Sequence, residues 1–235
     1  PHTLGHHDFF GNFKYFFGLS LRSHYPPTKY KYLHQFEKHM TSSQSPTQES
    51  INQLVALYNQ GQLDAVLEQA RILLTTHSDN AVVWNLVGTA NFSLGKIVEA
   101  SDAFKKATEL NPGFAGGHNN LAATFLHQGR LDEAISACQR ALNLKPNYAE
   151  AYGNLGVALR EQDRVDESLA AFDKALALKP DFVDAHNNLG IAHRKQGRIS
   201  EAIDSYQRAL FYDANSASAY INLANILSKR IFLER

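Results

Sequence analysis

The feature that most constrains the fold is a near-repetition of sequence at an interval of 34 residues. Residues 141–156 read ALNLKPNYAEAYGNLG and residues 175–190 read ALALKPDFVDAHNNLG, with nine of sixteen positions identical. Units with this period begin near residues 47, 81, 115, 149 and 183, and a half unit begins at 217. Self-similarity sustained at one period indicates a repeat array, in which stacked units bury a continuous core.

Each unit has the pattern of two helices joined by a turn. In the unit from residue 149, Tyr152, Leu155 and Leu159 share one helical face, and after the turn Leu169 and Phe172 lie on a second one. Small residues at the eighth and twenty-seventh positions allow the two helices to approach closely, and a proline at the thirty-second stops the second helix. One such hairpin cannot bury its apolar face alone, so stacking must supply the core.

The fifteenth position of the unit is expected to end the first helix. Glycine suits the left-handed backbone conformation that often follows a helix. Asp163 replaces glycine in one unit, so Asp163→Gly is expected to stabilise the array by up to about 1 kcal/mol through relief of strain. The fifteenth position holds Gly61, Gly95, Gly129, Asp163 and Gly197.

These positions together resemble the tetratricopeptide repeat, over about residues 47–231. The resemblance implies an all-α, right-handed superhelical solenoid of helix-turn-helix repeats. The first unit lacks the proline and has Val66 where a small residue is usual, so it is expected to be a degenerate or capping repeat. Residues 1–46 have no repeat register and are expected to be an irregular segment. Residues 1–39 are expected to be either the tail of a preceding domain or upstream sequence outside the natural start. The residues that carry the resemblance in the second unit are Trp84, Gly88, Ala100, Phe104, Ala107 and Pro112.

In arrays of this family the first helices line a concave groove, and one position of that helix is nearly invariant here. A carboxamide has donors and an acceptor, so it can pair with a peptide backbone of any sequence. The series resembles the asparagine ladder of O-linked N-acetylglucosamine transferase-like (SPINDLY-type) proteins, which hold polypeptide substrates by their backbone. The sixth position is Asn52, Asn120, Asn154, Asn188 and Asn222, interrupted by Leu86 in the second unit.

Such a ladder alone would bind weakly. Five rungs at about 1 kcal/mol each stand against an association cost of about 4–15 kcal/mol. Neighbouring side chains must therefore supply selectivity, and they change from apolar to basic along the array, which favours a peptide with an acidic end. The predicted groove residues beside the asparagines are Tyr58, Phe92, Arg160, Arg194 and Lys195.

No constellation of catalytic residues is found. His118 and His186 occupy a position where other units have aromatic residues, so they are interpreted as packing residues, and Cys138 as a core residue with an inert thiol. His6, His7 and Asp8 are only weakly similar to a metal site. We therefore predict no enzymatic activity, no cofactor and no metal in this chain.

Composition excludes several classes of partner. The formal net charge is zero, so no overall field favours nucleic acid, and no apolar stretch is long enough to cross a membrane. A single cysteine fits a reducing compartment, and we predict a cytoplasmic location.

We therefore predict a scaffold that binds a protein or peptide, either an extended polypeptide or a partner helix. The alternative is the substrate-recognition arm of a larger glycosyltransferase whose catalytic domain follows Arg235. Self-association is a third possibility, because a half unit at the C-terminal end leaves Leu223 and Leu227 without a second helix.

Overall fold

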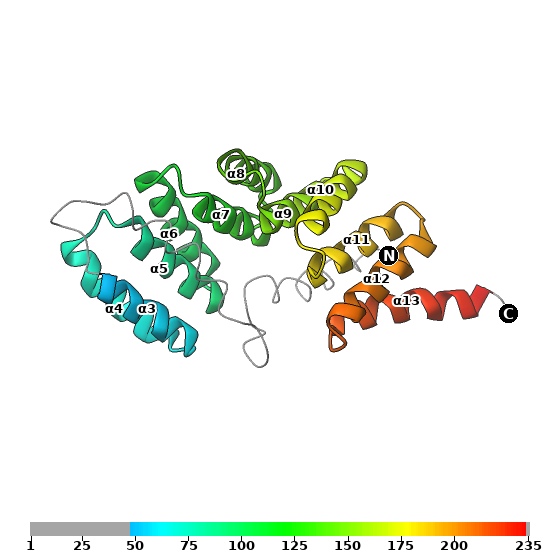
Figure 1. Cartoon of the computed structure of the whole chain (residues 1–235), viewed down its shortest axis with the longest axis horizontal. Helices are drawn as coiled ribbons and strands as arrows, with labels where there is room; N and C mark the ends of the chain where they lie inside the picture. Colours follow the sequence, from blue (N-terminus) through cyan, green and yellow to red (C-terminus); the bar gives the residue numbers. More distant parts are fainter. Residues whose placement is uncertain (1–47, 234–235) are drawn as a thin grey trace, which may run out of the picture. The chain divides into compact units, whose positions relative to one another are not determined.

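The computed structural model describes residues 48–233, and every regular element among them is an α-helix (Figure 1). The expectation of an all-α array of helical hairpins is confirmed. The first helices of the hairpins are α3 (Gln48–Asn59), α5 (Ala81–Ser93), α7 (Ala115–His127), α9 (Ala149–Glu161), α11 (Val183–Lys195) and α13 (Ala217–Leu233). The second helices are α4 (Leu63–Thr76), α6 (Ile97–Leu110), α8 (Leu131–Leu144), α10 (Val165–Leu178) and α12 (Ile199–Tyr212).

The described chain divides into two compact units between Pro112 and Gly113. In the first unit α3 packs on α4 and α5, α4 also packs on α5, and α5 pairs with α6. In the second unit each hairpin from α7 to α12 packs on the next, and α13 packs on α11 and α12. The predicted irregular segment, residues 1–46, lies outside the described residues.

Within each hairpin a residue of the first helix and the residue that faces it on the second helix are matched in size. A Cβ atom on Gly156 would lie 2.7 Å from the ring of Phe172, and one on Gly190 would lie 2.5 Å from the ring of Tyr206. Because an alkyl group cannot occupy that space, an aromatic second-helix residue requires glycine opposite it. The third hairpin uses a different pair at these positions, Ala122 with Cys138, and both residues are fully buried.

The turn that ends α9 has the same geometry as its glycine counterparts. Asp163 has φ 65°, and the corresponding Gly129 has φ 70°. The amide of Arg164 donates to the carbonyl of Leu159 at 2.9 Å, the bond that closes a helix when the preceding residue is left-handed. Asp163 therefore adopts a conformation that costs an L-residue energy and that glycine adopts freely.

Helix α13 is packed on one side only. Ile226 and Leu223 pack against Tyr206 of α12. Tyr220 is 54% exposed and Leu227 is 44% exposed. In the third and fourth hairpins the positions equivalent to Leu227 are Phe125 and Leu159, and both are buried. One apolar side of α13 thus has no described helix covering it.

Candidate functional site

The sequence-predicted residues of the second unit lie on four successive first helices, which we call the first-helix face. Three of its asparagines are almost completely buried: Asn154 is 0% exposed, Asn188 is 4% and Asn222 is 5%. Asn120 and Arg194 are half-buried, and Lys195 is exposed. The face consists of Asn120 on α7, Asn154 and Arg160 on α9, Asn188, Arg194 and Lys195 on α11, and Asn222 on α13.

Asn154 and Asn222 each bind an asparagine of the preceding first helix. Asn154 Nδ2 donates to Asn119 Oδ1 at 2.9 Å, and Asn222 Nδ2 donates to Asn187 Oδ1 at 3.0 Å. Both pairs are 35 residues apart and buried. A buried amide that lost its partner would pay the full cost of desolvation, so these bonds hold neighbouring repeats in register.

Asn188 has a different partner, because the preceding repeat has Gly153 in place of an asparagine. Its Oδ1 accepts a hydrogen bond from Arg160 Nη1 at 2.7 Å, and its Nδ2 donates to the carbonyl of Asp184 at 2.9 Å. Arg160 Nη2 also donates to Glu161 Oε1 at 2.9 Å. The Arg160 charge is thus paired and buried, with 7% of the residue exposed.

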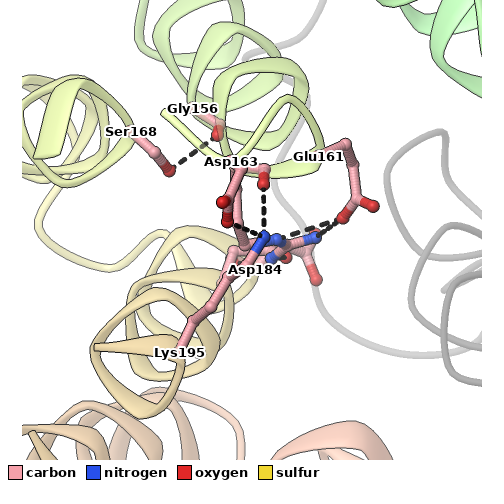
Figure 2. A network of polar contacts seen from close by, with 8 residues as sticks. Gly156, Glu161, Asp163, Ser168, Asp184 and Lys195 are labelled. Carbon is pink, nitrogen blue, oxygen red and sulfur yellow. Dashed lines mark hydrogen bonds and ion pairs between the residues drawn. The ribbon is translucent and has the colours of Figure 1, made fainter. Parts of the chain in front are cut away.

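Figure 2 shows the ammonium of Lys195 joining α11 to the end of α9. Lys195 Nζ donates to the carbonyl of Arg160 at 3.0 Å and lies 2.8 Å from Asp163 Oδ1. In the same view Ser168 Oγ donates to the carbonyl of Gly156 at 2.7 Å, which ties α10 to α9. Asp163 therefore has a partner in the next repeat as well as a strained backbone.

The predicted residues of the first unit lie on α3 and α5. Asn52 is exposed, and its Oδ1 accepts a hydrogen bond from Gln48 of the same helix at 3.0 Å. The Tyr58 hydroxyl is 3.1 Å from Ser93 Oγ of α5. Phe92 is buried, with 8% of its surface exposed.

Three family models of the tetratricopeptide repeat match residues 81–114, 114–181 and 154–220, which together span more than half of the chain. The chain belongs to the tetratricopeptide-repeat family. No curated protein matches the sequence. The finer resemblance to O-linked N-acetylglucosamine transferase-like proteins stays a hypothesis.

Solved structures of other repeat proteins share the fold. MamA is 25% identical, with a TM-score of 0.60 over 69% of this chain and 95% of its own. A thermophilic repeat protein of Thermus thermophilus is 22% identical, with a TM-score of 0.64 over 77% and 98%. YrrB, described as a repeat protein with an unusual peptide-binding site, is 20% identical, with a TM-score of 0.60 over 81% and 96%.

Burial shifts the pKa of several titratable groups of these tetratricopeptide repeats. His186 is buried, its ring stacks on Tyr212 with centroids 5.5 Å apart, and burial lowers its pKa. Burial also raises the pKa of the Cys138 thiol, and raises the pKa of the Asp184 carboxyl to about 6. Among residues 48–233 no three potential ligands are grouped to hold a metal ion, and no helix is long and apolar enough to cross a membrane. The weak metal candidates His6, His7 and Asp8 lie outside the described residues.

Sequence reasoning missed the partners of the buried asparagines. Asn119 and Asn187 occupy the fifth position of their repeats and were not predicted to contribute to the site. The sequence does contain a signal for these pairs. Each of the two residues lies 35 positions before an asparagine, which is one residue more than the repeat length. The two side-chain amides of each pair come together only when the repeats stack, so the sequence alone does not show that they face each other.

Proposed function

We propose that this tetratricopeptide-repeat chain is a protein- or peptide-binding scaffold that holds an extended polypeptide or a partner helix on its first-helix face. The observation that carries the proposal is the chain of cross-repeat bonds through Asn154, Asn188 and Asn222. These bonds hold the polar groups of the face in place before any ligand arrives, which lowers the entropy cost of binding.

The buried asparagines mainly hold the helices of this face together. A carboxamide has two donor hydrogens and an acceptor oxygen, and each of the three amides uses part of this capacity within the array. The less buried positions are Asn120 and Arg194 of the face, together with the exposed Asn225, which follows Asn222 by three residues on α13, so we assign direct contact with the ligand to them. The similar fold of YrrB, which is described as having an unusual peptide-binding site, supports a peptide as the ligand.

A matched pair of substitutions tests the proposal. The full chain is presented to an immobilised library of random decapeptides, and bound sequences are read out. Asn225→Trp adds bulk one helical turn from Asn222 of the first-helix face, whereas Asn143→Trp places the same bulk at an exposed position of the second helix α8. We expect Asn225→Trp to lose the enriched peptides and Asn143→Trp to retain them, with unchanged melting temperatures. Identical peptide sets for both variants would exclude the first-helix face as the binding surface.

The alternative role, as substrate-recognition arm of a larger glycosyltransferase, would use the same face. O-linked transfer requires a hydroxyl group on the acceptor. Because that hydroxyl would react in the catalytic domain and not on this face, the role predicts that natural polypeptides held here carry a serine or threonine next to the bound segment. A plain scaffold predicts no such requirement.

A second candidate function, self-association, is favoured by the uncovered side of α13. Tyr220 and Leu227 expose apolar surface that a second copy of the chain would bury. Leu227→Lys should weaken a dimer at least about tenfold in sedimentation equilibrium. The control is Leu144→Lys on α8, because Leu144 is 45% exposed and Leu227 is 44% exposed. Equal association of both variants would exclude this surface.

A further inference from the structure

The first-helix face carries three cations, and two of them are paired within the array. Arg160 is bound by Asn188 and Glu161, with distances of 2.7 and 2.9 Å. Lys195 Nζ is 2.8 Å from Asp163 Oδ1 and donates to a backbone carbonyl. Among the described residues the Arg194 guanidinium forms no hydrogen bond or ion pair, although the residue is half-buried.

The difference between Arg160 and Arg194 follows from their neighbours. Both hold the same position in successive repeats, and Arg160 reaches the asparagine 28 residues later. For Arg194 the residue 28 positions later is Asn222, whose Nδ2 donates to Asn187 Oδ1. In the preceding repeat Gly153 stands at the position of Asn187 and has no side chain to bind Asn188.

Arg194 also lacks the acidic neighbour in the sequence that binds Arg160. Arg160 is followed by Glu161, which binds its guanidinium, whereas Arg194 is followed by Lys195. A guanidinium beside a second cation favours an anion, and its planar donors match a carboxylate in a bidentate geometry. Partial burial strengthens such a pair relative to one in open water.

We propose that Arg194 binds a carboxylate of the bound polypeptide, from an aspartate or glutamate side chain. This inference rests on the proposed peptide-binding function and identifies the ligand as an acidic peptide. Arg160 and Lys195 keep neighbouring repeats together and leave Arg194 as the cation that selects the ligand.

The test uses the decapeptide library with amidated C-termini and the full chain as wild type, Arg194→Gln and Arg140→Gln. Arg140 is an exposed arginine of the second helix α8, so its variant removes the same charge from another surface. We expect the wild type and Arg140→Gln to enrich Asp or Glu at one position, and Arg194→Gln to lose this enrichment. The best peptide and its Glu→Gln (or Asp→Asn) form are then compared: the wild type should prefer the acid about tenfold, and Arg194→Gln should bind both equally.

The outcomes separate the two proposals. If the wild type enriches no peptide, the peptide-binding function and this inference both fail. If peptides are enriched without acids, or if Arg194→Gln keeps the acid preference, only the assignment of Arg194 is overturned. A parallel library with free C-termini identifies the source of the carboxylate. If the wild type binds peptides only when their C-termini are free, and Arg194→Gln loses this binding, then Arg194 binds the C-terminal carboxylate and not an acidic side chain.

Discussion

The Asn154 side chain donates a hydrogen bond to the Asn119 side chain, which lies 35 residues earlier on the neighbouring first helix, at 2.9 Å. Both residues are buried, so water cannot replace either partner. The same bond recurs between Asn222 and Asn187 two repeats later. The asparagines that the sequence predicts to bind a ligand therefore also join neighbouring repeats. Substitutions of these asparagines should change stability as well as binding.

Asn119→Ala should destabilise the second unit by about 1–3 kcal/mol, because it leaves the buried amide of Asn154 without its acceptor. The exposed Asn52 is the matched control, and Asn52→Ala should change stability by less than about 0.5 kcal/mol. Urea denaturation followed by circular dichroism measures both. Equal effects of the two substitutions would contradict a structural role for the Asn119–Asn154 bond.

Gly156→Ala should destabilise the fourth hairpin by about 1–3 kcal/mol, because its Cβ would lie 2.7 Å from the Phe172 ring. Adding Phe172→Cys creates the Ala–Cys combination of the third hairpin, Ala122 with Cys138. The double variant should therefore be more stable than the sum of the two single changes predicts, by at least about 1 kcal/mol. Additive effects in this double-mutant cycle would show that the two positions are not sterically coupled.

The expected stabilisation by Asp163→Gly is reduced by a contact that the sequence did not reveal. Asp163 lies 2.8 Å from Lys195 Nζ, and such exposed ion pairs contribute about 0.2–1 kcal/mol. In the wild type, relief of backbone strain and loss of the ion pair should nearly cancel. In a Lys195→Met background only the strain remains, and Asp163→Gly should raise stability by up to about 1 kcal/mol. The melting temperatures of the four proteins test this, and the same shift in both backgrounds would refute it.

Asp184 should make the array less stable as the pH rises. Burial raises the pKa of its carboxyl to about 6 from 3.8, so the folded state binds this proton more tightly than the unfolded chain. The stabilisation is complete below about pH 4 and is lost as the pH rises through about 6. Asp184→Asn should thus gain about 1–3 kcal/mol relative to wild type between pH 4 and pH 7.

The exposed Asp181 in the preceding turn supplies the control for this pH dependence. Thermal melts across pH 4–7 should show no comparable gain for Asp181→Asn. A gain for Asp184→Asn that is equal at both ends of the range would disprove the role of its titration.

Cys138 should be inert in the folded protein, because its thiol is fully buried and burial raises its pKa. A thiol reagent such as dithionitrobenzoate should label the native chain many-fold more slowly than the urea-unfolded chain. Since the chain has one cysteine, the labelling rate reports opening of the third hairpin alone. Fast labelling under native conditions would mean that Cys138 is accessible.

The sequence by itself determined the hairpins, their stacking and their turns, because these depend on residues at fixed spacing within one 34-residue unit. Gly156 and Phe172 are 16 residues apart, and Asp163 occupies a glycine position in the same unit. Local helical periodicity and the need to bury apolar faces are enough to predict these features.

Only the tertiary structure decided which polar residues of the first-helix face are paired. Arg160 and Arg194 hold equivalent positions in the sequence. The Arg160 guanidinium is bound by Asn188 and Glu161, whereas the Arg194 guanidinium forms no hydrogen bond or ion pair with the described residues. The outcome depends on the residue that the neighbouring helix places opposite each side chain. Hydrogen bonds require approach within about 3 Å, and that proximity arises only when the repeats stack.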